Sequence, residues 1–483
     1  MVFNSLAFFL FLAILFSLYW FAFKKSVKAQ NILILIASYF FYGCWDWRFL
    51  SLILLSTIVD YFVGIQIYKT ENKILRKRWL WVSVLFNVGL LGFFKYYNFF
   101  VDSWTDLASA LGYTIKSTWT LSVILPVGIS FYTFQTMSYS FDIYYKRLEP
   151  TRNFLSFATF VSFFPQLVAG PIERASNLLP QIINKRIFKD KQIIEGMKLM
   201  LWGLFKKIAI ADALAPMVDD IFTNYASYPA STLVLGICFF SFQIYCDFSG
   251  YSDIAIGTAK LFGVELMTNF KFPYFSRNIG EFWRRWHVSL SSWFRDYIYI
   301  PLGGSRVSKL KGIRNVFVIF LVSGFWHGAN WTFIIWGAFH ALAFIPVFLM
   351  GDHTKYKNTI IAQTTLLPNL KEIGKVLLTF SFVSFSWIFF RSDSMTDAIL
   401  FIRQLFDNFS FEIYKNPLGY RMEDYFILLL IFIVYEYLIR KTPRSPFNFN
   451  NKVLRFVSYT AVILGILLFY DDGIDRSFIY FQF

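Results

Sequence analysis

Apolar stretches long enough to cross a lipid bilayer recur along the whole of this 483-residue chain. A helix needs about 20 predominantly apolar residues to span the hydrocarbon core. Inside that core every backbone polar group must be satisfied within the protein, which favours helices. Charged residues make up 16% of the sequence, whereas soluble domains carry roughly 25%. The sequence therefore predicts an all-α polytopic membrane protein.

We expect about 10 to 12 spanning helices, together with re-entrant pieces that surrounding protein would shelter. The clear candidates are Leu6–Phe23, Phe49–Tyr68, Trp79–Phe94, Leu121–Tyr144, Thr232–Tyr245, Lys375–Phe390, Tyr425–Leu438 and Leu454–Tyr470. Shorter or interrupted candidates are Asn31–Cys44, Phe154–Gly170, Met197–Ile210 and Asn315–Met350. Because the chain has no long linker, low-complexity tract or internal repeat, residues 1–483 are predicted to form one integral-membrane domain.

The distribution of basic residues predicts the orientation of the chain. Met1–Ser5 carries no positive charge, and lysines follow the first apolar run, which is the reverse of a signal peptide. By the positive-inside rule, basic segments face the cytoplasm, namely 69–78, 146–152, 173–191, 306–314 and 440–452. The acidic segment 211–229 and the C-terminus, with Asp471, Asp472 and Asp475, are predicted to lie outside. The N-terminus is also predicted outside, which requires an even number of spans.

The net charge of +16 is therefore assigned to membrane orientation and not to nucleic acid, for which the chain offers no soluble sheet or groove. The three cysteines, Cys44, Cys238 and Cys246, lie in or beside apolar runs. No CxxC or Cys/His ligand spacing occurs, so neither disulfides nor a metal site is expected.

The segment Glu281–Gly304 concentrates arginines, a histidine and tryptophans in a chain with few charges. If it forms one continuous helix, an apolar arc results, made of Phe282, Trp283, Trp286, Leu290, Trp293 and Phe294. The opposite side carries a polar stripe, made of Arg284, His287, Ser291 and Arg295. Arg285 adds a further cation. One interpretation is an interfacial helix that holds lipid headgroups, and another is the wall of a reaction site.

Polar groups inside apolar segments collect in the central half of the chain, and each is a candidate functional residue. Gln135 and Asp142 follow one such segment, and Pro165 and Pro171 break the next. The stretch QIYCDFSGYSDIAIG then begins at Gln243 and contains Asp247 and Asp253. These acids either pair with the arginines of the 284–295 segment and hold the fold, or support the reaction.

The stretch GFWHGANWTFIIWGAFHA contains Trp326 and two histidines. Glycines flank His327, so helix geometry is expected to break there. On a continuous helix His340 would lie about 20 Å away, so the two could not act on one atom. His327 is the stronger catalytic candidate, although a lone histidine in an apolar helix is often a hydrogen-bonded core residue.

Several kinds of chemistry lack their sequence motifs in this chain. No Walker loop, GxSxG elbow or HExxH motif occurs. A histidine can remove the proton of a hydroxyl as that oxygen attacks an activated acyl group, and nearby arginines can bind the phosphates of an acyl carrier. The residues thus favour acyl transfer, and a proton-coupled transporter stays open as an alternative.

The motifs WRRWHVSLSSWFRDYIYIPLGG, GFWHGANWTFIIWGAFH, FFPQLVAGPI, CDFSGYSDIAIG and WIFFRS resemble the membrane-bound O-acyltransferase (MBOAT) family. The similarity is strongest to its bacterial branch for alginate and peptidoglycan O-acetylation. The motif-bearing core covers about residues 121–392, flanked by helices in 1–120 and 393–483.

The resemblance implies a ring of helices around a central tunnel in the bacterial cytoplasmic (inner) membrane. His327 of the WHG motif would be the catalytic residue, and His287 of the RWH motif its partner. Arg284, Arg285, Arg295, Ser291, Trp326, Asp247, Asp253 and Gln243 would bind or support the substrates. Acetyl-CoA would be the donor, with no bound cofactor. Expected partners are membrane lipid, a polysaccharide acceptor and a separate extracytoplasmic SGNH-type protein.

A related branch of the family transfers D-alanine to teichoic acids and shares both histidines. There the counterpart of FFPQLVAGPI reads more like a serine-containing SGP, whereas this chain has Ala169-Gly170-Pro171, which favours the acetyl branch. The resemblance leaves the acceptor polymer open.

Overall fold

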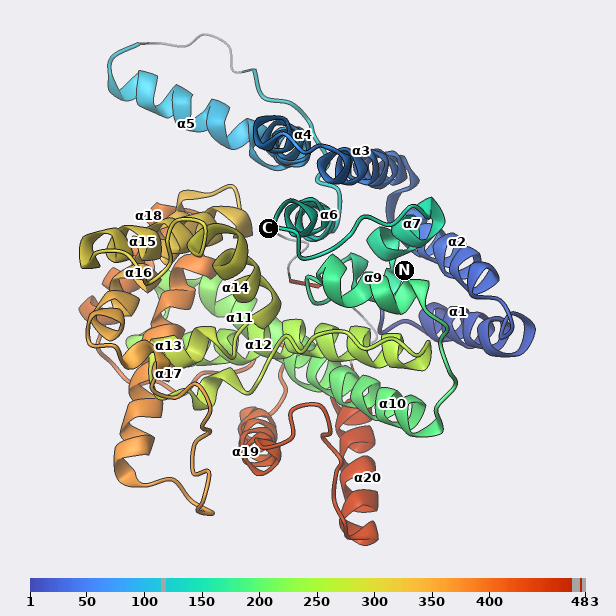
Figure 1. Ribbon diagram of the computed structural model, residues 1–483. Helices are drawn as coiled ribbons and strands as arrows, with labels where there is room; N and C mark the ends of the chain where they lie inside the picture. Colours follow the sequence, from blue (N-terminus) through green and yellow to red (C-terminus); the bar gives the residue numbers. More distant parts are fainter. Residues whose placement is uncertain (114–118, 471–477, 480–483) are drawn as a thin grey trace. The chain divides into compact units, whose positions relative to one another are not determined.

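The computed structural model describes residues 1–113, 119–470 and 478–479, and these residues form helices and no β-strand (Figure 1). The all-α prediction is confirmed. The chain divides into two compact units. One comprises Met1–Gly196 and Thr258–Met267, and the other comprises Met197–Gly257 and Thr268–Phe483. The helices α10 (Asp190–Phe205) and α12 (Ala230–Leu261) contribute residues to both units.

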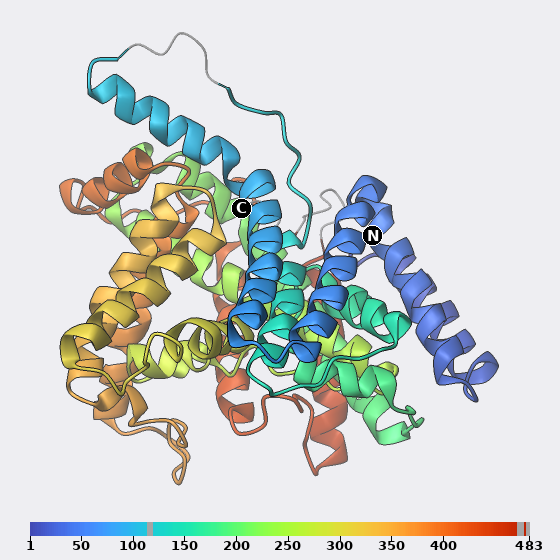
Figure 2. The ribbon, with the colours of Figure 1, turned by 45° about the horizontal axis from the view of Figure 1, so that its top comes forward.

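In the first unit α6 packs against α3, α4 and α9, and α7 packs against α2 and α9. The helices of this unit are α1 Leu6–Ser17, α2 Val27–Asp46, α3 Leu50–Lys69, α4 Lys73–Leu91, α5 Tyr97–Ala110, α6 Ile129–Tyr144, α7 Phe154–Ser162, α8 Phe164–Leu167 and α9 Ala175–Ile183. In Figures 1 and 2 the blue helices α3 and α4 run alongside each other, and α6 packs against both.

The second unit contains all the residues predicted to form the reaction site. Its helices are α11 Ala213–Thr223, α13 Ile279–Trp283, α14 Val288–Phe294, α15 Lys309–His327, α16 Trp331–Leu349, α17 Leu370–Arg391, α18 Met395–Asp407, α19 Met422–Ile439 and α20 Lys452–Leu468. α15 packs along α16, and α16 packs against α13 and α17.

Five helical stretches in the described residues are long and apolar enough to cross a membrane. They are Val27–Lys69, Lys73–Ala110, Ala230–Leu261, Trp331–Leu349 and Leu370–Arg391, and Leu6–Ala22 is a shorter apolar helix. Val27–Lys69 has 43 residues, about twice the length that one span needs. It is interrupted at the 3-10 turn Trp47–Phe49, close to the predicted gap between Asn31–Cys44 and Phe49–Tyr68.

The structure corrects one predicted span and confirms two predicted breaks. The stretch Leu121–Tyr144 is not one helix, because α6 begins only at Ile129, after Pro126 and a left-handed Gly128. In the FFPQLVAGPI segment, α7 ends at Ser162 and no long helix resumes before α9, as the prolines predicted. Asp471, Asp472 and Asp475, which carry the predicted orientation of the C-terminus, lie outside the described residues.

The second confirmed break separates α15 from α16. α15 ends at His327, Gly328 is extended, and the side chain of Asn330 caps α16 by accepting from the backbone N–H of Thr332 at 3.0 Å. Gly324 and Gly337 let the two helices approach closely, because a Cβ at either position would collide with a carbonyl oxygen of the other helix. This close packing fixes the direction in which α15 ends.

A buried carboxylate joins three helices of the first unit. Asp60 on α3 accepts hydrogen bonds from Ser83 of α4, from Asn87 of α4 at 2.7 Å and from Ser140 of α6 at 2.7 Å. Ser56 donates to Asn87 at 2.8 Å and extends the network. All five side chains are fully buried. Buried polar groups without partners are costly, so each member depends on the others.

Replacing Asp60 by alanine should therefore destabilise the packing of α3, α4 and α6, because Ser83, Asn87 and Ser140 lose their shared acceptor. We expect a loss of about 1–3 kcal/mol, measured by unfolding the purified protein in a lipid mimetic. Asp60→Asn keeps an acceptor and should lose less. Asp102→Ala, an exposed acid on α5, is the control. Equal stability of the Asp60→Ala and Asp102→Ala proteins would contradict the interpretation.

Candidate active site

His327 lies at the last residue of α15 and is enclosed by aromatic rings from three helices. Its ring centroid is 5.0 Å from Trp326, 5.1 Å from Trp336 of α16 and 5.3 Å from Phe390 of α17. The side chain is buried, with 3% of its surface exposed. Phe390 belongs to the WIFFRS motif, so this third motif helps to form the surroundings of His327.

His287 lies at a second break, between α13 and α14, where the sequence predicted a continuous helix. That prediction was wrong. α13 ends at Trp283, and His287 takes a left-handed backbone conformation with φ 43° and ψ 54° before α14 begins at Val288. A residue with a Cβ rarely adopts this conformation, which must be held by its surroundings.

The two predicted catalytic histidines approach the same indole. The ring of Trp326 is 6.0 Å from that of His287 and 5.0 Å from that of His327. Phe248 of α12 also packs against His287, with its ring 4.6 Å from the imidazole. The structure therefore brings the RWH and WHG motifs together, although they are separated by about 40 residues of sequence.

His340 is hydrogen-bonded to a side chain of α17, although the ring of Trp336 packs against both His340 and His327. Its Nε2 lies 3.0 Å from the hydroxyl of Ser386 on α17, and its ring packs against Trp283 and Trp336. The side chain is fully buried. These contacts are those of a hydrogen-bonded core residue that joins α13, α16 and α17.

Since the helix is broken, the predicted polar stripe of the 284–295 segment does not form. Arg284 donates to the carbonyl oxygen of His353, and the exposed Arg295 pairs with Asp296 at 2.6 Å. Ser291 donates to the carbonyl oxygen of Trp286 at 3.3 Å. The apolar arc is largely buried in the protein, as Phe282, Trp286, Leu290, Trp293 and Phe294 each expose 4% or less. The interfacial-helix interpretation therefore does not fit this segment.

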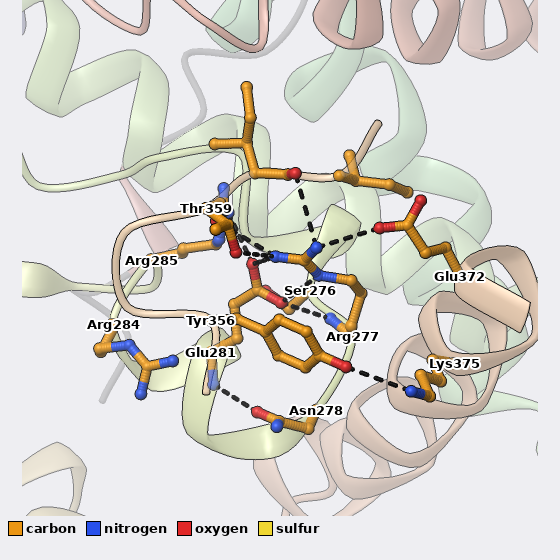
Figure 3. Close-up of polar contacts among 12 residues, drawn as sticks. Ser276, Arg277, Asn278, Glu281, Arg284, Arg285, Tyr356, Thr359, Glu372 and Lys375 are labelled. Atoms are coloured by element: carbon orange, nitrogen blue, oxygen red, sulfur yellow. Dashed lines mark hydrogen bonds and ion pairs between the residues drawn. The ribbon is translucent and has the colours of Figure 1, made fainter. Parts of the chain in front are cut away.

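Arg285 belongs to a buried charge cluster around Glu281 (Figure 3). One carboxylate oxygen of Glu281 accepts from Arg285 at 2.7 Å and from Arg277 at 3.0 Å. Arg277 also bonds Glu372 at 3.0 Å, and its guanidinium stacks on the ring of Tyr356 at 3.9 Å. Figure 3 shows these groups converging from the segment before α13, from the loop after α16 and from α17. The cluster fixes the backbone that leads to His287.

The acids of α12 pair with lysines and not with the arginines that the sequence suggested. Lys207 contacts Asp247 at 2.6 Å and Asp212 at 2.7 Å, and Lys206 contacts Asp253 at 2.6 Å. Both lysines are buried in the π-helical turn η4, Lys206–Asp212. Two adjacent lysines in the apolar run WGLFKKIAIA were a signal that the sequence analysis did not use. Gln243 is half-buried on the same helix.

Phe478 and Ile479 also reach this site, which the sequence analysis missed. The backbone N–H of Ile479 donates to Asp247 at 2.7 Å. The ring of Phe478 lies 5.6 Å from Phe248 and 4.8 Å from Tyr251. Phe248 also contacts His287, so Phe478 is linked to the candidate catalytic residue through one intervening side chain.

A search of the described residues for three or more His, Cys, Asp or Glu side chains placed to hold one metal ion finds no such group. The site contains two imidazole rings packed among aromatic side chains, and the acids of α12 near them are engaged in ion pairs. This arrangement can hold or move a proton at a ring nitrogen while excluding water.

Comparison with known proteins connects this geometry with acyl transfer. Residues 79–369 match the sequence model of the membrane-bound O-acyltransferase (MBOAT) family. A probable alginate O-acetylase, AlgI, of Pseudomonas syringae pv. tomato is 40% identical, over 82% of this chain and 73% of the relative. A peptidoglycan O-acetyltransferase of Helicobacter pylori is 37% identical, over 78% and 74%. A teichoic acid D-alanyltransferase of Streptococcus thermophilus is 30% identical over 56% of this chain and 69% of its own length.

The Glu281 cluster generates a stability prediction. Glu281→Gln leaves two buried guanidinium groups without their shared counter-charge, so we expect a loss of about 3–5 kcal/mol in unfolding experiments. Glu423→Gln is the matched control, because its partner Arg421 lies 4.0 Å away and both side chains are exposed. That change should cost less than about 0.5 kcal/mol. If both variants unfold alike, the cluster does not stabilise the segment before His287.

Proposed function

The chain belongs to the membrane-bound O-acyltransferase family, and from this we propose that it moves acetyl groups from a cytoplasmic donor to a hydroxyl on the other side of the membrane. It is an O-acyltransferase enzyme and a multi-pass membrane protein. We propose the donor, the acceptor and the direction of transfer from the following observations.

The observation that carries the proposal is the relationship to two proteins named for O-acetylation, which extends over about four fifths of the chain. Alginate and peptidoglycan, the polymers in those names, both contain sugar chains with hydroxyl groups. A polysaccharide hydroxyl, or a hydroxyl of a partner protein that passes the acetyl group on, is therefore the acceptor that we propose. The rings of His287 and His327 both pack against Trp326, and two histidines in one site are suited to the proton transfer that this assignment requires.

In the proposed reaction His327 acts as the general base. Its neutral ring takes the proton of the acceptor hydroxyl while that oxygen attacks the carbonyl carbon of an acetyl thioester such as acetyl-CoA. The new C–O bond forms, the C–S bond breaks, and the thiolate leaves with the proton that the imidazolium returns. The overall exchange needs no bound cofactor. His287 orients the substrate or stabilises charge beside it.

The other predicted site residues take supporting roles in this proposal. The ring of Trp326 packs against the rings of both histidines. Asp247 and Asp253, with Lys207 and Lys206, form ion pairs behind them. Arg285 supports the backbone through Glu281, whereas Arg284 and Arg295 are engaged elsewhere with protein groups. Their contact with the donor stays a proposal, as it does for Ser291 and Gln243.

We further propose that about 10 to 12 helices surround a tunnel in the bacterial cytoplasmic membrane, with both termini outside. Such a tunnel would let the donor stay in the cytoplasm while the acceptor stays outside. A separate SGNH-type protein and the polysaccharide acceptor are the proposed partners, in addition to membrane lipid.

D-alanyl transfer is a second candidate function. The observation that favours it is the relative of Streptococcus thermophilus named for teichoic acid D-alanylation. That similarity covers 56% of this chain, whereas the O-acetylation relatives cover about 80%. We therefore place acetyl transfer first.

The catalytic assignment predicts that His327→Ala lowers polymer O-acetylation in cells by about 10²–10⁴-fold at unchanged abundance in the membrane. His353→Gln is the control, because only the backbone carbonyl of His353 is bonded to Arg284. Acetate released from isolated polymer by mild base provides the measurement. Wild-type acetylation in the His327→Ala strain would disprove the assignment.

A second experiment separates the candidate functions. Purified protein in lipid discs receives labelled acetyl-CoA, and release of free thiol with transfer of label supports the acetyl reaction. Turnover only with a D-alanyl thioester of a carrier protein would support the second candidate. Transport of label in vesicles without thiol release would instead support a proton-coupled exporter and refute both enzyme assignments.

The orientation is tested with reporter fusions to the end of the full chain. Alkaline phosphatase is active outside the cytoplasm, and green fluorescent protein fluoresces inside it. Positive-inside placement of the basic segment 440–452, which the apolar run Leu454–Tyr470 follows, predicts an active phosphatase and a dark fluorescent fusion. The reverse pattern would show that the number of spans is odd or that the N-terminus lies inside.

A further inference from the structure

Asn269 is a buried polar residue whose side chain lies within hydrogen-bond distance of the His287 ring. It lies on an extended segment after α12, and this segment pairs with the break that carries the histidine. The N–H of Val288 donates to the carbonyl oxygen of Asn269 at 2.8 Å, and the N–H of Lys271 donates to that of Arg285 at 2.9 Å. The Asn269 side chain is fully buried. These bonds fix its amide next to the imidazole of His287.

The direction of the Asn269 amide follows from its neighbours. The backbone N–H of Ser289 lies 3.4 Å from one terminal atom and can only donate, so that atom must be Oδ1. The hydroxyl of Ser289 also donates to Oδ1, at 2.9 Å. At the other end Nδ2 donates to the hydroxyl of Ser252 at 3.0 Å. A flipped amide would face its two hydrogens toward the Ser289 N–H.

The amide direction determines the tautomer of His287. The Nδ1 atom lies 3.1 Å from Oδ1 of Asn269, and this oxygen carries no hydrogen. A hydrogen bond therefore requires the proton on Nδ1. A neutral imidazole has one N–H, so its lone pair is then on Nε2. His287 lies outside the helices long enough to span a membrane, and burial lowers its pKa to about 3.

We propose that Asn269 is a positioning residue that holds His287 as the neutral Nδ1–H tautomer, so that His287 meets the substrates only as a hydrogen-bond acceptor, through Nε2. The inference rests on the acyl-transfer function proposed above and decides between the two roles left to His287 there. An acceptor nitrogen orients an O–H or N–H group of a substrate. It cannot donate a hydrogen bond to the oxyanion that forms when the thioester carbonyl is attacked.

The tautomer can be measured directly by solid-state NMR of ¹⁵N-histidine-labelled protein in bilayers. The chain has four histidines, and a His287→Gln variant assigns the signals of His287. We expect a protonated Nδ1 and an unprotonated Nε2 in the wild-type protein. A protonated Nε2 in the wild-type protein would overturn the proposal. This result does not depend on turnover, so it stands even if the acyl-transfer function fails.

Kinetics then test whether the tautomer matters for catalysis. Asn269→Leu removes the acceptor and should lower kcat/KM about 10–100-fold. Asn269→Asp keeps an oxygen beside Nδ1 and should restore most of the turnover at high pH. A raised KM for the thioester in the leucine variant would show that His287 orients an N–H group of the acyl donor. A raised KM for the polysaccharide or protein that receives the acetyl group would show that His287 orients the hydroxyl of that substrate.

The pH profile distinguishes positioning from a merely structural role. A carboxylate at position 269 favours the imidazolium and raises the pKa of His287 from about 3 toward neutrality. The aspartate variant should thus lose activity as the pH falls from 8 to about 5, because its His287 becomes protonated over this range. In the wild-type protein His287 stays neutral over the same range and should cause no loss. Near His287 the acids of α12 are engaged in ion pairs, Asp247 with Lys207 and Asp253 with Lys206. The flanking segments carry Lys271, Arg284 and Arg285, and both variants retain all of these groups as well as His327.

Asn184→Asp adds the same charge at an exposed position and should leave the profile unchanged. If the leucine variant fails to fold, the aspartate variant and Ser289→Ala, which removes one donor to Oδ1, still test the proposal. An aspartate variant with the wild-type pH profile, or a leucine variant with wild-type kcat/KM, would overturn it.

Discussion

The close packing of α15 against α16 is the constraint on which the candidate site depends. Gly324 and Gly337 allow the backbones to touch, and Asn330 caps the second helix. Between them the chain must leave the helical conformation at Gly328, which places His327 at a helix end and not within a helix. Its ring then has side-chain neighbours from α15, α16 and α17. A reactive group at a break can be surrounded on several sides, whereas one in mid-helix shares its surroundings with its own backbone.

The position of His287 depends on a different set of contacts, which also places the histidine at a break between two helices. A buried ion cluster around Glu281 holds the chain before the break, and the paired segment with Asn269 holds it at the break. Buried charges are costly unless they are paired and hydrogen-bonded. Here the arginines, and the lysines of η4, are neutralised within the unit. The imidazoles are thus left in an aromatic enclosure, where burial keeps His287 uncharged.

Much of this organisation was predictable because it depends on short-range physics. Hydrophobic runs predicted helices, and glycines beside His327 and prolines in FFPQLVAGPI predicted helix ends. The segment 281–304 was mispredicted because its periodicity fits a continuous helix. The left-handed conformation at His287 is flanked by hydrogen bonds that join Arg285 and Val288 to the 269–271 segment, which is distant along the chain. No sequence pattern within the segment indicates that contact. The suggested partners of Asp247 and Asp253 were wrong for the same reason, since their partners Lys207 and Lys206 are brought to them by helix packing and by no pattern in the sequence.

By itself the sequence determined the helical class, the membrane character and which two histidines are the catalytic candidates. Composition, apolar length and motif are properties of local segments, so they can be read without the tertiary structure. Family membership follows from sequence as well, through long similarity to O-acetylating relatives. Only the tertiary structure decided that Trp326 contacts both histidines, that lysines neutralise the α12 acids and that Asn269 faces Nδ1 of His287. Each of these is a contact between residues distant along the chain, and its existence depends on how whole helices pack.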